Sequence, residues 1–239
     1  MKIAILFSGG LDSLIMKRWA EVKYPNAEVV CVFYDIGQEY LEKELAALPD
    51  YVIQRKLDWL GGSSGESKEG SSSGNIYIPG RNLVLATNVA CAFLPDQIWM
   101  GALLGETHDT ATDKNWTFLS MASETLSYVL SPFKPSGVTV HFPLAEGGLN
   151  KLTATQWALE NGVSKEAIVN SSSCLSGEAG KCGHCVVCFR RWGIFKQLGL
   201  HEDYNVHPLS VEANQKIIEE MRNGDYYDEH RKMEILPAL

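Results

Sequence analysis

Four of the six cysteines stand within a fifteen-residue segment, at a spacing that suits a metal ion. Cys174, Cys182, Cys185 and Cys188 form the pattern C-x7-C-x2-C-x2-C. Four thiolates at such spacing can surround one tetrahedral zinc ion, and the two-residue spacers let backbone N–H groups face the sulfur atoms. Because sulfur would fill every position, we expect this cluster to hold structure rather than to do chemistry. An iron–sulfur cluster takes the same four ligands and is the alternative.

A second segment with chemical potential, Ser8–Ser13 (SGGLDS), directly follows the apolar run at residues 3–7. Such a run followed by glycines is typical of a buried strand that enters a tight loop. Residues 14–20 have helical composition, and Asp12 or Ser13 is placed to cap that helix. A strand–loop–helix unit directs backbone N–H groups and the positive helix end at one point, which favours an anion. Neither a Gly-Lys-Ser/Thr ending nor GxGxxG is present, so this is not a Walker A loop. The segment is either a polyphosphate site of another kind or a strand-to-helix turn that uses Gly and Ser for steric reasons only.

The elements that must position these residues alternate between apolar runs and helical patterns. Repeated alternation predicts an α/β fold, with a Rossmann-like parallel sheet flanked by helices. Ligands of such sheets bind beyond the carboxyl ends of the strands, where Ser8–Ser13 would lie. Cys31 on an apolar strand and Cys91 on an apolar helix are expected to be core residues. We expect strands at 3–7, 29–34, 51–53, 97–101 and 138–142, and helices at 39–48, 83–93, 118–130, 151–161 and 210–222.

Three units are expected along the chain. Residues 1–165 would form the nucleotide-binding α/β domain, 166–200 the four-cysteine zinc-binding subdomain, and 201–239 a C-terminal helix and tail. The tail would either wrap the domain or join a subunit contact. Residues 61–74 are rich in Gly and Ser and have almost nothing to bury, which predicts a mobile loop. That loop is either a passive insertion or a lid over bound substrate.

Composition and charge narrow the possible partners. The chain has 239 residues, of which 45% are hydrophobic and 21% charged, as in ordinary globular proteins. A formal net charge of −8 argues against direct binding of nucleic acid and permits a small-molecule substrate. No signal peptide and no run of about 18 apolar residues is visible, so we expect a cytoplasmic protein without membrane contact. In that reducing compartment the cysteines would not form disulfides.

Several segments, in this order along the chain, resemble the 7-cyano-7-deazaguanine synthase family of the PP-loop ATP pyrophosphatase superfamily. The superfamily pattern SGGxDS matches Ser8–Ser13. The other matching segments are IGQ at 36–38 (family YGQ), IPGRN at 78–82 (VPGRN), Pro143-Leu144 followed by Lys151, and residues 173–190 (SC…CGxCxxCxxR). The match covers roughly residues 1–200.

The resemblance implies a Rossmann-like PP-loop domain with a small zinc-bound subdomain, and it implies ATP, magnesium and zinc as cofactors. The substrates would be 7-carboxy-7-deazaguanine and ammonia. One ATP would convert the carboxylate to an acyl-adenylate that ammonia attacks, and a second would convert the resulting amide to the nitrile. The product, 7-cyano-7-deazaguanine, would serve queuosine-type or modified-DNA biosynthesis. A homodimer is a candidate assembly.

By the same resemblance, several residues acquire roles. Asp12 would hold magnesium at the phosphates, or else cap a helix. Arg81 can neutralise a phosphate, Gln38 can read adenine or ribose, and Lys151 can stabilise leaving pyrophosphate or the adenylate. Without the resemblance, Arg81 and Lys151 would be ordinary solvated residues. The catalytic candidates are Asp12, Ser13, Arg81 and Lys151, and the ATP-binding candidates are Phe7, Ser8, Gly9, Gly10, Leu11, Asp12, Ser13, Leu14, Gln38 and Arg81.

Two segments depart from the family pattern. Glu39-Tyr40 stand where the family has Arg-His. Residues 105–116 contain no faithful copy of the family's D-x-S-x-Y-P-D-C-R segment, and Asn115 falls where its arginine should be. Asp109 and Asp113 could accept the N–H donors of a guanine-like edge, or they are solvated loop carboxylates. The departure leaves ATP chemistry better supported than the identity of the base.

Three other functions remain open at this stage. One is a different PP-loop amide ligase that acts on a related deazapurine or carboxylate. A PP-loop tRNA thiolation enzyme is the next, although the acidic charge balance disfavours it. The last is a non-enzymatic zinc module, which would not bind ATP.

Overall fold

The computed structural model describes residues 1–60, 78, 80–107, 112–224 and 227–239. Its sheet has five strands in the order β3-β2-β1-β4-β5, and every pairing is parallel. This topology confirms the predicted α/β fold with a parallel sheet. The predicted loop at 61–74 lies outside the described residues. The strands are β1 (Lys2–Leu6), β2 (Glu28–Asp35), β3 (Ile53–Lys56), β4 (Gln97–Trp99) and β5 (Thr139–His141).

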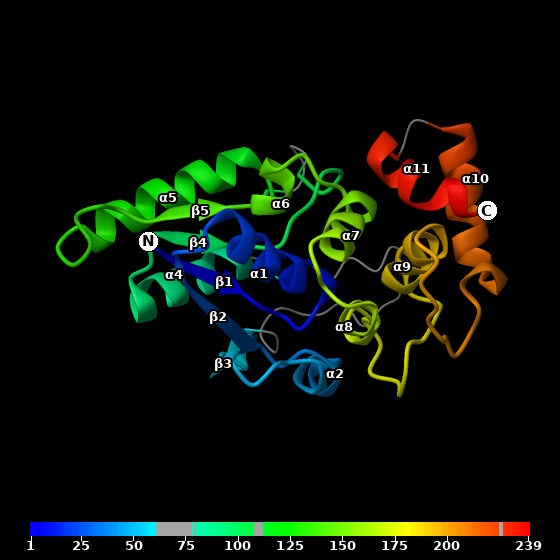
Figure 1. Cartoon of the computed structure of the whole chain (residues 1–239), viewed down its shortest axis with the longest axis horizontal. Helices are drawn as coiled ribbons and strands as arrows, with labels where there is room; N and C mark the ends of the chain where they lie inside the picture. The colour runs from blue at the N-terminus through cyan, green and yellow to red at the C-terminus, as the bar shows by residue number, and fades with distance from the viewer. Residues whose placement is uncertain (61–77, 79, 108–111, 225–226) are drawn as a thin grey trace.

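Side chains of the central strand β1 point alternately to the two faces of the sheet, and each face has its own hydrophobic core. In β1, Ala4 packs with the buried residues of α4 (Arg81–Phe93) and α5 (Trp116–Leu130). Ile3 and Ile5 point to the other face, where α1 (Leu11–Lys23) and α7 (Lys151–Glu160) supply the core. Such alternation follows from the two-residue period of a strand. Helices therefore cover both faces, as the alternating pattern predicts (Figure 1).

Two expectations about these elements are wrong. The short strand expected at residues 51–53 begins only at Ile53, and its remaining residues are exposed. A polar strand at the edge of the sheet carries no apolar run, so hydrophobic patterning did not locate it. Cys31 is buried as expected, but Cys91 lies on the exposed side of α4.

The C-terminal third gathers at the end of the molecule toward which the strands point (Figure 1). A third hydrophobic cluster joins α9, α10 and α11 through Phe189, Met221 and Ile235. Helix α10 lies close to its predicted range, whereas α8, α9 and α11 were not predicted. The elements here are α8 (Lys165–Asn170), α9 (Val186–Gln197), η1 (Pro208–Ser210), α10 (Glu212–Asn223), α11 (Glu229–Ile235) and η2 (Leu236–Ala238). Two shorter helices elsewhere are α2 (Leu41–Ala46) and α6 (Pro143–Glu146).

Among the described residues, no helix is both long and apolar enough to cross a bilayer.

Candidate functional site

The glycine–serine segment joins β1 to α1 at the carboxyl end of the central strand. Helix α1 is capped by Gly10 and begins at Leu11, so the expectation that Asp12 or Ser13 caps it is wrong. Both residues instead lie in the first turn, where the Ser13 hydroxyl donates to the Gly10 carbonyl oxygen at 2.8 Å. The turn requires Gly9, which has a φ of +71°. A Cβ at Gly9 would lie 3.0 Å from the Glu44 carbonyl oxygen, so the backbone of α2 closes this side of the loop.

Lys151 is brought to this loop from 139 positions along the chain, and its ammonium lies 3.1 Å from Asp12 Oδ2. It is the first residue of α7, a helix capped by the Asn150 side chain. The other carboxylate oxygen, Asp12 Oδ1, is buried and has no hydrogen-bond partner within the described structure. A buried unpartnered carboxylate oxygen is costly unless a cation or donor meets it. Oxygen is the ligand that magnesium prefers, so Asp12 fits a Mg²⁺ ligand.

A cavity of about 270 Å³ opens beside the loop, beyond the ends of β1 and β2. Six of the ten predicted ATP-binding residues line it: Phe7, Ser8, Asp12, Ser13, Gln38 and Arg81. The other four shape the loop or its support rather than the cavity wall. Gly9 and Gly10 pack against Glu44 and Ser172, Leu11 is buried in the core, and Leu14 packs partly against it. The remaining wall is partly apolar, with Val32, Phe33, Tyr34, Ile36 and Met100 among its residues.

Glu44 is a cavity residue that the sequence analysis missed. The Gln38 side chain donates to Glu44, and Gln38 Oε1 in turn accepts the Ile36 backbone N–H at 2.9 Å. Gln38 therefore positions a carboxylate and a turn, in addition to facing the cavity. Burial raises the pKa of Glu44 to about 7, against the lowering effects of the Gln38 hydrogen bond and of nearby Arg81. One signal could have pointed to it: Glu44 stands three residues after Leu41, on the apolar stripe of α2.

The segment that departs from the family pattern reaches the cavity only indirectly in the described residues. Asn82, a lining residue, donates to the Asp113 backbone oxygen at 3.0 Å. Asn115 accepts the Phe118 backbone N–H at 2.9 Å and thereby caps α5. Asp109 lies outside the described residues. Residue 115, where the family pattern has an arginine, thus serves here as a helix cap.

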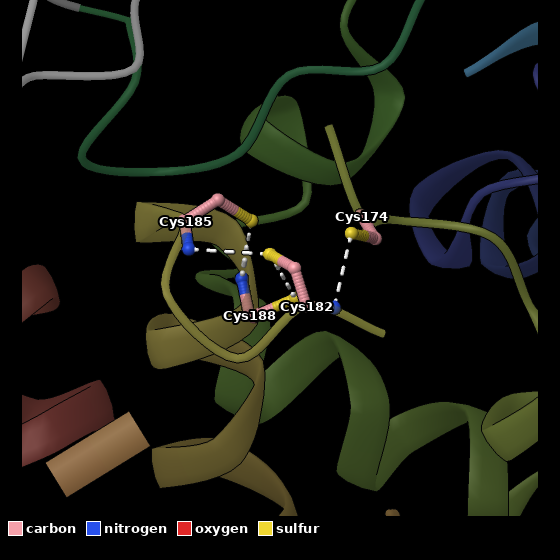
Figure 2. A group of neighbouring side chains, drawn as sticks. All are labelled: Cys174, Cys182, Cys185 and Cys188. Carbon is pink, nitrogen blue, oxygen red and sulfur yellow. Dashed lines mark hydrogen bonds between the residues drawn. The ribbon is translucent and has the colours of Figure 1, made fainter. Parts of the chain in front are cut away.

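The four predicted metal ligands meet at a single point. Each residue of the set Cys174, Cys182, Cys185 and Cys188 offers one sulfur atom, and all of these atoms lie within 4.8 Å of one another. Figure 2 shows Cys174 on a segment separate from the loop and helix start that carry the other three. Backbone N–H groups of Cys185 and Cys188 donate to the sulfurs of Cys182 and Cys185, each at 3.4 Å. This arrangement is the one expected of two-residue spacers around a tetrahedral ion.

A glycine makes the tight wrap possible. Gly183 has a φ of +79°, and a Cβ there would lie 1.7 Å from the Val206 carbonyl oxygen. Any side chain at this position would displace the residue 206 segment and the cluster with it.

Without a cation, the pKa values of three thiols in the cluster are shifted in different directions. Hydrogen bonds from Cys185 and Cys188 lower the pKa of Cys174, while burial raises the pKa of Cys182 to about 11. The hydrogen bond with Cys174 raises the pKa of Cys188. A divalent cation allows all four to ionise, so the donor set fits a metal ion.

The cysteine cluster and the glycine–serine loop Ser8–Ser13 are joined by the residues before Cys174. The Ser172 backbone N–H donates to the Gly9 carbonyl oxygen at 2.9 Å. A Cβ at Gly10 would lie 3.0 Å from the Ser172 oxygen, which shows how closely the two backbones approach. Within the described residues, the hydroxyl of Ser173 and Asp12 Oδ1 are the buried side-chain atoms without partners. Both are therefore at or beside this loop.

A glycine–serine loop at the first strand–helix junction of a parallel sheet, with a four-cysteine cluster against it, defines a protein of the PP-loop class. The chain belongs to the queuosine biosynthesis protein QueC family, whose model matches residues 62–199. Membership confirms the family resemblance drawn from the sequence.

Known relatives and a solved structure extend the comparison. The 7-cyano-7-deazaguanine synthase of Chlorobium luteolum is 26% identical over 237 residues, covering 89% of this chain and 100% of the relative. The enzyme of that name from Caulobacter sp. strain K31 is 31% identical over 227 residues, covering 79% and 87%. The U34-tRNA thiolase NcsA from Methanococcus maripaludis, solved with its 4Fe-4S cluster, covers 100% of this chain and 71% of its own at 13% identity and a TM-score of 0.40.

Proposed function

We propose that this chain is an ATP-dependent ligase that converts 7-carboxy-7-deazaguanine and ammonia to 7-cyano-7-deazaguanine. Relatives of that name match it over most of its length. The observation that carries the proposal is Asp12, which pairs with Lys151 through one oxygen and leaves the other buried and unpartnered at the cavity. Such a pair suits a nucleotide phosphate and its cation better than it suits a purely structural role.

The first half-reaction forms an amide. The substrate carboxylate attacks the α-phosphorus of ATP, which gives an acyl-adenylate and pyrophosphate. Ammonia then attacks the acyl carbon, AMP leaves with the C–O electron pair, and a proton is released. Activation is needed because a carboxylate oxygen is a poor leaving group, whereas AMP is a good one.

The second half-reaction removes the amide oxygen. That oxygen attacks the α-phosphorus of a second ATP, and pyrophosphate leaves again. Loss of AMP with the C–O electron pair, and of both protons of the amide nitrogen, then leaves the nitrile. Each nitrile therefore requires two molecules of ATP and releases two of AMP and two of pyrophosphate.

The residues divide this work by position. The loop Ser8–Ser13 and the start of α1 present N–H groups and a positive helix end to the departing pyrophosphate. Lys151 and Arg81 would neutralise the charge that develops there, Lys151 from beside Asp12 and Arg81 from the cavity wall. A magnesium ion held by Asp12 would shield the phosphate charges. Zinc held by the four cysteines would fix the segment before Cys174 against the loop.

The proposed partners are the two small substrates and ATP, with no direct contact to nucleic acid. A homodimer is the proposed assembly. Domain limits at 165 and 200 are proposed for the nucleotide-binding and cysteine-bearing units, because the first cysteine ligand and the elements after it follow the sheet.

The test measures both stoichiometry and product mass. Metal-loaded protein is incubated with ATP, magnesium, ammonium and 7-carboxy-7-deazaguanine, and AMP and products are quantified by liquid chromatography with mass spectrometry. We expect two AMP per nitrile, and AMP formation by Asp12→Asn that is slower by about 100- to 1,000-fold. One AMP per amide, with no nitrile, would identify a different amide ligase. AMP formation that requires another carboxylate or a tRNA would reject the proposed substrate.

A further inference from the structure

A carboxylate on the last α-helix reaches the start of α7. Glu234 of α11 is fully buried, with 0% of its surface exposed. Its Oε1 accepts the Lys151 backbone N–H at 2.8 Å and the Arg190 Nη2 at 2.7 Å. Its Oε2 accepts from Arg190 Nε. Both oxygens are therefore engaged, and they join α11 to α9 and to α7.

The contact falls where a helix needs an acceptor. Lys151 is the first residue of α7, and the first N–H groups of a helix have no partner within it. A negative charge at this end is also favoured by the helix dipole. The neighbouring cap satisfies a different group, since Asn150 accepts from the Thr153 N–H at 2.9 Å. Glu234 thus supplies the acceptor for the N–H of Lys151 itself.

Lys151 is consequently held at both of its ends. Its backbone is fixed by Glu234, and its ammonium lies 3.1 Å from Asp12 Oδ2. The reach of that side chain into the nucleotide site depends on where α7 begins. A shift of α7 would move the ammonium away from Asp12, although neither residue had changed.

Arg190 extends the same network to the segment after β4. Besides Glu234, it donates to Glu106, and Arg231 lies 3.5 Å from Glu106 and 3.7 Å from Glu234. Burial acts against the charge on Glu106, but Arg190 and the other surrounding cations lower its pKa. Buried charges of this kind are tolerated only when each has its partners. The network therefore specifies one relative placement of α7, α9 and α11.

We propose that Glu234 is a positioning residue for the adenylation site, which acts by fixing the first residue of α7 so that the Lys151 ammonium meets Asp12. Helix α11 lies outside residues 62–199, which the family model matches. On this view helix α11 supports the catalytic site through Lys151 without lining the cavity. The kinetic readout rests on the proposed function, whereas a chemical readout on Lys151 does not.

The test compares Glu234→Gln with Glu229→Gln. Glutamine keeps an oxygen for the Lys151 N–H but removes the charge that holds Arg190, whereas Glu229 is 81% exposed on the same helix. We expect Glu234→Gln to lower kcat by about 10- to 100-fold, because a small displacement of a catalytic group has this cost. The KM for ATP should change little, since the loop at 8–13 is intact. Glu229→Gln should resemble wild type.

A second readout labels lysines with acetic anhydride and quantifies them by mass spectrometry. The Lys151 side chain is only 11% exposed, and we expect its labelling rate to rise several-fold in Glu234→Gln, with Lys216 unchanged as an exposed internal standard. This measurement holds even if the wild type forms no AMP from the proposed substrate. Glu234→Asp serves if Glu234→Gln does not fold, because it retains the charge and withdraws the carboxylate from the Lys151 N–H.

Wild-type kcat together with wild-type Lys151 labelling, in whichever variant folds, would overturn the proposal. A lower melting temperature with both readouts unchanged would do the same, since it would assign Glu234 to stability alone. Failure of both variants to fold would also assign Glu234 to stability alone and overturn the proposal.

Discussion

The cysteine cluster and the nucleotide cavity meet at residues 172–174 but draw on the chain in opposite ways. All four thiols come from fifteen consecutive residues, so their spacing largely sets their geometry. The cavity is lined by Asp12 from α1, Glu44 from α2 and Arg81 from α4, and Lys151 of α7 contacts Asp12. A local site can therefore be predicted from the spacing of its residues in the sequence, whereas an assembled site depends on how parallel strands align their loops.

The strongest way to break the local site is to remove one ligand. Cys185→Ser should abolish metal binding and unfold the cysteine-bearing segment, since a structural zinc contributes on the order of 10 kcal/mol that is coupled to folding. Metal content by mass spectrometry and circular dichroism measure both effects. The matched control is Cys91→Ser, which removes an exposed cysteine of α4 outside the cluster. Full metal content and stability in Cys185→Ser would reject the metal site.

The strongest way to break the assembled site is to neutralise Asp12. Asp12→Asn keeps the shape of the side chain but removes the charge that faces Lys151 and would hold magnesium. We expect AMP formation to fall by about 100- to 1,000-fold, as when one electrostatic contact to a transition state is lost. The melting temperature and metal content should stay near wild type. Asp50→Asn, at an exposed residue, is the control, and equal activity of the two variants would contradict the site.

The two sites also differ in how far the sequence predicted them. All four metal ligands converge as predicted, because the loop and the first turn of α9 carry three of them. In the assembled site, Asp12 was proposed from the glycine–serine loop, whereas Arg81 and Lys151 were proposed through the family resemblance. Glu44 was missed, since its importance comes from burial and from Gln38 rather than from any motif.

Helix α9 was missed for a related physical reason. Helix α9 contains buried Arg190 and Arg191, so its sequence does not show the apolar face that usually reveals a helix. Arg191 is satisfied by Glu202, by the Ser171 hydroxyl and by backbone oxygens of α8. These partners are distant in sequence or irregular in spacing. Buried charge becomes predictable only once the tertiary contacts are known.

A milder test probes the junction where the loop packs against α2. Gly9→Ala would place a Cβ 3.0 Å from the Glu44 carbonyl oxygen at a φ of +71°. Conformational strain alone costs about 1–2 kcal/mol, and the backbone contact adds to it. We expect ATP affinity, measured by calorimetry, to fall by about tenfold or more. Gly199→Ala isolates the contact, because Gly199 has a φ of +63° and nothing within 4 Å of its Cβ position. Equal ATP affinities of Gly9→Ala and wild type would show that this loop does not bind the nucleotide.

The smallest effect concerns Glu44 and the pH dependence of stability. Burial raises the pKa of its carboxyl to about 7 in the folded chain, whereas the ordinary value for a glutamate is 4.5. Between these values the folded state binds more protons than the unfolded state, so stability falls as pH rises. Over this window the loss should be on the order of 1–3 kcal/mol.

Glu44→Gln removes this titration but keeps an oxygen that can accept from Gln38. Urea unfolding at several pH values from 4.5 to 7.5 should therefore show a flatter profile for the variant than for wild type. The variant should be the more stable of the two at the upper end, where the wild-type carboxylate is charged and buried. Glu42→Gln, at an exposed position of the same helix, should leave the wild-type slope unchanged. Parallel profiles for wild type and Glu44→Gln would contradict the raised pKa of Glu44. They would mean that water in the cavity solvates this carboxylate as well as it does in the unfolded chain.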